Sequence, residues 1–139
     1  MKELLLFFGM FIMHYLGDWV LQTDVIAKYK QKDNWEDLIA KDKMYEDDYS
    51  CVMEIHCLFW SICIHIPIVI HEYITTGFIY EDFPSFFEIF LLASIIVNMI
   101  IHYVVDELKA NRKLINLRID QSIHYVQIAA TLAIYLILR

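Results

Sequence analysis

Three pairs of aspartate and histidine stand four residues apart, in well separated parts of the sequence. The pairs are His14 and Asp18, His102 and Asp106, and Asp120 and His124. A spacing of four places both side chains of a pair on one face of a helix. Imidazole and carboxylate groups together suit divalent transition metals. The pairs therefore predict a metal site, provided that their helices come together.

The order within the pairs predicts a common depth. Histidine comes first at 14–18 and 102–106, whereas aspartate comes first at 120–124. If the helix that carries Asp120 and His124 runs antiparallel to the helices of the other two pairs, the three aspartates share one membrane boundary. The three histidines then lie one turn, ~5–6 Å, deeper. A further histidine lies at a similar depth in a fourth apolar segment. We expect one layer of metal ligands from these residues: His14, Asp18, His56, His102, Asp106, Asp120 and His124.

Four apolar stretches carry this layer. They cover approximately residues 4–22, 52–73, 86–107 and 119–138. Each is close to the ~20 residues that cross a ~30 Å hydrocarbon core. A lipid-embedded span must satisfy its own backbone hydrogen bonds, which predicts helices. The sequence Ser85-x-x-Glu88 predicts a capping box at the start of the third helix. The expected fold is therefore all-α, a four-helix transmembrane bundle that forms a single domain over residues 1–139.

Composition agrees with a membrane protein and excludes other classes. The chain is 59% hydrophobic, and a soluble domain of 139 residues could not bury so much apolar surface. The net charge of -7 and the lack of a basic face argue against nucleic acid as a partner. Cys51, Cys57 and Cys63 form no C-x-x-C pair, so we expect three reduced, buried thiols.

The connections between the stretches predict an orientation. Nine of the eleven Lys and Arg residues lie in the connections after the first and third stretches. The positive-inside rule places both connections in the cytoplasm and both termini outside, in the inner membrane of a bacterium. The charged segment 24–50 is expected to be partly helical and to lie at the membrane surface, with a helix start near Asn34. A solvated loop is the alternative.

Further polar residues extend the helix faces that carry the pairs. They are Gln22, Asn98, Lys109, Gln121 and Gln127. Ionisable groups within a span are costly, so they normally face the bundle interior and mark a function. Zinc is the first expectation for the ion, with manganese or iron as alternatives. Seven candidate ligands exceed what one tetrahedral zinc needs, so we expect one or two ions, and a metal-free polar network is the alternative.

These motifs resemble a family of small integral membrane proteins found in bacteria and their phages and defined by a domain of unknown function. The resemblance rests on His14-x-Leu16-Gly17-Asp18-x-x-Leu21-Gln22, His56, His102-x-x-x-Asp106-x-x-Lys109 and Asp120-Gln121-x-x-His124. It implies that these polar positions belong together, and it supplies no reaction. The layout is also similar to that of small membrane-bound, metal-dependent hydrolases, although no motif is shared with them.

The leading functional hypothesis is a metal-dependent hydrolase. Its substrate would be a lipid head group or a small phosphorylated or acylated molecule that reaches the membrane surface. One of the three aspartates, Asp18, Asp106 or Asp120, would act as the general base. Lys109, together with Gln22 or Gln121, would stabilise negative charge that develops on the substrate.

Two alternatives come from other classes of protein. A transporter or channel for a metal ion or protons would also place Asp and His inside the membrane. The polar stripes are expected to end at Asn98 and Gln127, about halfway across, so a path would require a homo-oligomer. The third hypothesis is a non-catalytic membrane module of phage or bacterial origin. In it the segment 24–50 binds a partner, and the polar layer only holds the bundle together.

Overall fold

The computed structural model describes residues 2–77 and 85–139, so most of the 75–85 connection lies outside the described residues. The described residues are mostly helical, and none of them lies in a strand. Its α-helices are α1 (Lys2–Tyr15), α2 (Asp24–Tyr29), α3 (Glu36–Lys41), α4 (Asp48–Thr76), α5 (Phe86–Ala110) and α6 (Leu117–Leu138). A π-helical turn, Leu16–Val20, follows α1, and short 3-10 turns occupy Lys32–Trp35 and Lys43–Tyr45.

Four helical segments are long and apolar enough to cross a membrane. They are Glu3–Val20, Lys43–Thr76, Phe86–Ala110 and Leu117–Leu138. Their outward faces carry exposed apolar side chains; on α5 these include Phe86, Ile89, Leu92, Ile96 and Ile100. Exposed apolar surface of this extent suits contact with lipid rather than water. The predicted all-helical membrane protein with four candidate spans is confirmed at this level.

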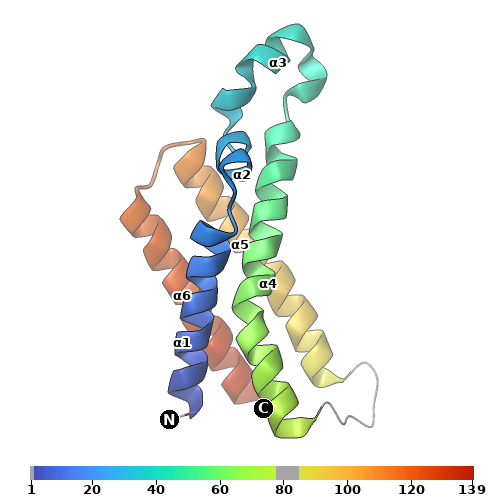
Figure 1. Ribbon diagram of the computed structural model, residues 1–139, viewed down its shortest axis with the longest axis vertical. Coiled ribbons are helices and arrows are strands. Elements are labelled where there is room, and N and C mark those ends of the chain that lie inside the picture. Colours follow the sequence, from blue (N-terminus) through green and yellow to red (C-terminus); the bar gives the residue numbers. More distant parts are fainter. Residues whose placement is uncertain (1, 78–84) are drawn as a thin grey trace.

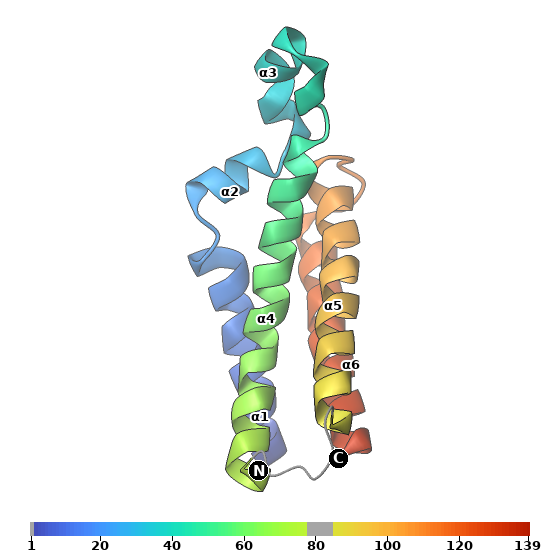
Figure 2. The same cartoon turned by 90° about the vertical axis from the view of Figure 1, so that its right-hand side faces the viewer.

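The four long helices lie side by side, with both termini at one end (Figure 1). We call that end the terminal end, and the opposite end, which holds α2, α3 and the 111–116 connection, the loop end (Figures 1 and 2). Helix α4 packs against α1 and α5, and α6 packs against α5 and α1. The four helices therefore surround a common interior, to which each contributes one face.

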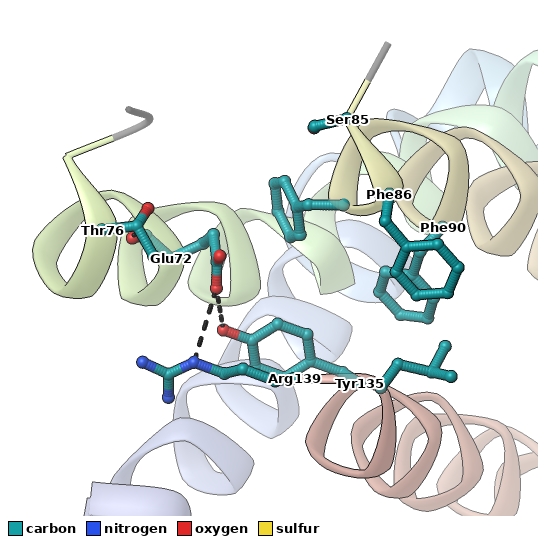
Figure 3. A pocket seen from close by; sticks show the side chains of 9 residues that line it. Glu72, Thr76, Ser85, Phe86, Phe90, Tyr135 and Arg139 are labelled. Atoms are coloured by element: carbon teal, nitrogen blue, oxygen red, sulfur yellow. Dashed lines mark hydrogen bonds and ion pairs between the residues drawn. The ribbon is translucent and has the colours of Figure 1, made fainter. Parts of the chain in front are cut away.

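The interior divides into an apolar half and a polar half. The apolar cluster consists of Leu6, Met10, Trp60, Ile64, Ile68, Ile128, Leu132 and Tyr135. At the terminal end this cluster is bordered by a polar contact, in which the Tyr135 hydroxyl donates to Glu72 Oε2 over 2.7 Å. Arg139 Nε lies 3.7 Å from the same carboxylate oxygen (Figure 3). The contact joins α4 to the end of α6. The other half of the interior, toward the loop end, contains the layer of candidate metal ligands.

The end of α1 departs from α-helical geometry beside the polar layer. The Leu21 N–H donates to the Leu16 carbonyl over 2.8 Å, which closes a π-helical turn. Gly17 lies in this turn, and a Cβ there would lie 3.2 Å from both Trp60 Cα and Cys63 Cβ. A larger residue there would require α1 and α4 to move apart by a few tenths of an ångström, so glycine favours their close approach. The turn aims the following residue, Asp18, into the interior.

Local signals in the sequence explain where other elements begin. The Ser85 hydroxyl accepts from Glu88 N–H, and the Glu88 carboxylate accepts from Ser85 N–H, which confirms the predicted capping box. The charged segment 24–50 contains α2 and α3, and α3 begins at Glu36, two residues after the predicted start. All three cysteines are free thiols, but Cys51 is exposed rather than buried because it lies near the loop end of α4.

Candidate metal centre

The seven candidate ligands from the sequence converge in the interior of the bundle. All are buried: His14, Asp18, His56, His102, Asp106, Asp120 and His124. Helix α1 and its π-helical turn contribute the first two, α4 contributes His56, and α5 and α6 contribute a pair each. Burying so many ionisable side chains is costly unless they neutralise one another or bind an ion.

One group that could hold a metal ion consists of Asp18, His56 and His102, which offer ligand atoms within 4.8 Å of one another. His56 Nε2 lies 3.3 Å from His102 Nε2 and 3.4 Å from Asp18 Oδ1. Two atoms bound to one zinc at ~2.0–2.2 Å can be at most ~4.4 Å apart, and a tetrahedral arrangement separates them by about 3.4 Å. The observed separations therefore match two ligands of a single ion.

A second group consists of His102, Asp106 and His124. His124 Nε2 lies 3.9 Å from Asp106 Oδ1 and 3.5 Å from Asp120 Oδ1, so Asp120 adjoins this group at His124. The two groups share His102. Asp106 also reaches toward both, because its other oxygen, Oδ2, lies 3.4 Å from His56 Nε2.

Four buried side-chain atoms here have no hydrogen-bond partner among the described residues. One is His102 Nδ1, and the other three, Asp106 Oδ1, Asp120 Oδ1 and His124 Nε2, face one another. A buried polar atom without a partner costs about 1–3 kcal/mol, and three facing one another cost more. A cation between them would satisfy all three at once.

The orientation of the His124 ring is fixed by its other nitrogen. Its Nδ1 lies 2.9 Å from Gln127 Oε1. The amide nitrogen of Gln127 donates to Asn98, so the Gln127 oxygen faces His124 and accepts the Nδ1 proton. Nε2 of His124 therefore faces the two carboxylate oxygens. Metal-binding histidines are commonly held in this way, with the second ring nitrogen donating to an oxygen.

Two lysines neutralise the other oxygens of these carboxylates. Lys30 Nζ donates to Asp106 Oδ2 over 2.6 Å, and Lys109 Nζ donates to Asp120 Oδ2 over 2.7 Å. Each aspartate thus gives Oδ2 to an ammonium group and turns Oδ1 toward His124, and Lys109 Nζ also lies 3.8 Å from Asp106 Oδ1. With Asp18, three carboxylates face two ammonium groups, an excess of one negative charge. A divalent cation would reverse this excess to one positive charge, which favours binding of an anion.

His14 takes a different position from the other histidines. The Trp60 indole can only donate, and it does so to His14 Nδ1 over 2.8 Å. His14 Nε2 therefore carries the proton and donates to Gln121 Oε1 over 3.0 Å. The Gln121 amide in turn donates to Asp18 Oδ2 and to Asp120 Oδ2. Both nitrogens of His14 are occupied, so its role is to orient two carboxylates through Gln121.

Trp60 and Lys30 belong to the site but did not stand out in the sequence. The Trp60 ring stacks on His102 with centroids 4.2 Å apart, and His102 stacks on His124 at the same distance. Trp60 falls on the face of α4 that also carries His56, four residues earlier. This spacing could have indicated from the sequence that Trp60 lies beside the candidate ligands. Lys30 comes from the charged segment, where its neighbours offer no signal that separates it from the other lysines.

The polar network continues from the candidate ligands toward the middle of the bundle. Beyond Gln127, Asn98 Nδ2 donates to Thr131 Oγ1 over 2.8 Å. Gln22, the remaining supporting residue, accepts from Lys30 Nζ over 2.7 Å at the loop end. All five supporting residues expected from the sequence therefore contact this network, and Thr131 extends it by one step.

Comparison of the chain with family models, curated proteins and solved structures finds no match. The geometry of the site is therefore the basis for assigning a function. That geometry offers two overlapping ion positions, lysines that offset the carboxylates, and a supporting hydrogen-bond network around them.

Proposed function

We propose that the protein is a membrane-embedded metal-dependent hydrolase with its centre at the loop end of the bundle. The observation that carries the proposal is that three buried atoms, on Asp106, Asp120 and His124, have no hydrogen-bond partner among the described residues. Their separations of 3.5 and 3.9 Å suit ligands of one divalent ion. Imidazole and carboxylate donors favour zinc, with manganese or iron as alternatives.

The primary ion position takes its ligands from the second group. His102 and His124 would each supply a ring nitrogen, and Asp106 and Asp120 would each supply Oδ1. A second ion at Asp18, His56 and His102 would make the centre dinuclear. The ratio of metal to protein distinguishes one ion from two.

The residues around the primary position fit hydrolysis. A divalent ion in such a site lowers the pKa of a coordinated water and polarises the bond under attack. Asp18 lines an open pocket, so it can reach a substrate and act as the general base when only the primary position is filled. Lys109 and Gln121 line the same pocket and can stabilise negative charge on a substrate.

The proposed sidedness puts the centre at the cytoplasmic surface of the inner membrane. Nine of the eleven basic residues fall in the two connections at the loop end, and the positive-inside rule assigns that end to the cytoplasm. Both termini would then lie outside. The substrates within reach would be lipid head groups or small phosphorylated or acylated molecules of the cytoplasm.

A substrate panel tests the hydrolase proposal. Purified, metal-loaded protein is assayed against p-nitrophenyl phosphate, bis-p-nitrophenyl phosphate and p-nitrophenyl acetate, with metal-stripped protein as the control. We expect at least one ester to be hydrolysed, and Asp18→Asn to lower kcat with metal still bound. Protein that holds its metal but hydrolyses none of the three, nor their lipid-linked counterparts, would contradict the proposal.

One observation favours a second candidate function, transport of protons or a metal ion. The buried polar face of α6 runs almost its full length, through Asp120, His124, Gln127, Thr131 and Tyr135. Buried apolar side chains such as Ile64, Ile68 and Leu132 lie in the same region and interrupt it. Proteoliposomes with an internal pH or metal dye separate the two functions. Transport predicts a flux that Thr131→Val reduces, and absence of flux removes this candidate.

A further inference from the structure

We infer that a pocket beside the proposed metal centre is a binding subsite for a phosphate group, in the first instance that of a lipid head group. The inference deepens the proposed function, on which it rests for the reaction that would follow binding. The pocket has a volume of about 300 Å³ and opens at the loop end. Its polar lining includes Gln22, Lys30, Lys109 and Gln121, together with Asp18 and Asp24.

The two lysines of this lining favour an anion. An ammonium group has three N–H donors. Lys30 uses two of them within the described structure, on Gln22 and Asp106, and Lys109 uses one, on Asp120. Both therefore keep donors for a ligand. Two adjacent ammonium groups with spare donors suit a phosphate, whose several oxygens accept charge-assisted hydrogen bonds.

Two carboxylates also line the pocket, and their positions explain why they do not exclude an anion. Asp18 Oδ2 accepts from Gln121 over 2.9 Å, and Asp18 Oδ1 lies 3.4 Å from His56 Nε2, so both of its oxygens already have partners. Asp24 is exposed at the start of α2, where solvent screens its charge. The lysines, by contrast, lie deeper than Asp24, and Lys30 is 6% exposed.

The pocket lies at the depth of lipid head groups. Three candidate spans end beside it: Glu3–Val20 next to Trp19, Phe86–Ala110 next to Lys109, and Leu117–Leu138 at its first residue. Trp19 and Leu117 form part of its rim and are 58% and 50% exposed. Tryptophan is enriched at the membrane interface. A phosphate in the pocket could therefore remain attached to chains that extend along this apolar rim into the bilayer.

The subsite is held in place by the structure around it. Lys30 follows α2, and its carbonyl accepts from Asn111 Nδ2 over 3.3 Å. Asn111 Oδ1 also accepts from the Lys32 N–H over 2.8 Å. The side chain of Asn111, at the end of α5, thus fixes the backbone on both sides of residue 31. Lys30 is positioned before any ligand arrives, which lowers the entropic cost of binding.

Native mass spectrometry of the full chain in an uncharged maltoside detergent tests the inference. The probes are dioctanoyl phosphatidylglycerol, glycerol 3-phosphate and dioctanoylglycerol, which carries the same chains without phosphate. We expect at least one phosphate probe to bind about tenfold or more tightly than dioctanoylglycerol, a difference of about 1.4 kcal/mol. Binding of the lipid alone assigns the subsite to a head group, and binding of glycerol 3-phosphate assigns it to phosphate in general. Equal binding of all three probes, or none, overturns the inference.

Matched variants locate the site. Lys30→Gln with Lys109→Gln should abolish the preference, whereas Lys28→Gln with Lys113→Gln removes the same charge at exposed positions of the loop end and should retain it. If the glutamine pair fails to fold, Lys30→Arg with Lys109→Arg serves instead. It keeps the charge and should retain the preference. A preference that survives in a folded glutamine pair overturns the inference.

The same measurement on chelator-treated protein separates this inference from the proposed function. The lysines do not depend on an ion, so metal-free protein should still prefer the phosphate probe. A preference for phosphate in purified protein that holds no metal would contradict the hydrolase proposal and support the subsite. Bound metal without a preference for phosphate would contradict the subsite and support the metal centre.

Discussion

Trp60 donates its indole N–H to Nδ1 of His14 over 2.8 Å, and this bond connects α4 to α1 in the middle of the polar layer. It fixes the tautomer of His14, and through Gln121 it orients Asp18 and Asp120. A tryptophan buried among apolar side chains thus takes part in holding two carboxylates in position.

Replacing Trp60 with phenylalanine should remove the hydrogen bond and keep an aromatic ring over His102. We expect metal affinity to fall about 10- to 100-fold, as for other residues that orient ligands. Competition with a chromophoric chelator measures this. The control is Trp19→Phe, since Trp19 is 58% exposed and should leave metal affinity unchanged. Equal affinities of the two variants would exclude the orienting role.

Gln121 joins three side chains, so Gln121→Leu should affect stability and the site together. The change leaves His14, Asp18 and Asp120 each without one partner. We expect a loss of at least about 2 kcal/mol in the free energy of unfolding, because buried partners lose their hydrogen bonds. Unfolding in detergent measures it, beside Ser122→Ala on the exposed face of the same helix. A leucine variant as stable as the alanine control would show that the network contributes little.

Gly17→Ala tests the close approach of α1 and α4. The new Cβ would meet Trp60 Cα and Cys63 Cβ at 3.2 Å, and backbone atoms must shift at a cost of about 1–3 kcal/mol. Gly9→Ala is the comparison, because its Cβ would meet Pro67 Cβ at 3.3 Å, farther from the polar layer. Both should lower the melting temperature, but only Gly17→Ala should also weaken metal binding. Equal metal affinity in the two variants would show that the close approach of α1 to α4 at Gly17 does not position the metal ligands.

Asn111→Ala should release the segment that carries Lys30. It removes the hydrogen bonds to the backbone of Lys30 and Lys32. Hydrogen–deuterium exchange of residues 24–35 should increase, with little change in α4. Arg112→Ala, next in sequence but largely exposed, serves as the control. Unchanged exchange in the Asn111 variant would mean that the segment is held by other contacts.

The helices and the polar layer could be predicted from the sequence because both follow from short-range rules. Length and hydropathy locate spans, and the four-residue spacing of His102 and Asp106 fixes their common face. Asp120 precedes His124, the reverse of the order in the other pairs, and their helix is antiparallel to the other two. The reversed order therefore places Asp120 and His124 at the same depths as the other aspartates and histidines. The capping box at Ser85 and Glu88 is likewise a local pattern, and it was confirmed.

The remaining features depend on contacts between distant residues. The sequence does not distinguish Trp60 from Trp19, although one is buried on His102 and the other is exposed. Lys30 reaches the site from the charged segment, and its backbone is bonded to Asn111, 81 residues later. The π-helical turn that aims Asp18 inward arises where Gly17 meets α4. Each of these requires knowing which helix faces meet, which no local pattern supplies.

The most direct test of the central claim is the metal content of purified protein. Elemental mass spectrometry of detergent-purified protein should find one or two equivalents of a transition metal, with zinc expected first. A variant with His102→Ala and His124→Ala should lose the primary ion, while Tyr135→Phe, at the terminal end, should retain it. Folded protein without metal, even after incubation with zinc, manganese and iron, would contradict a metal centre, as would full metal content in the double variant.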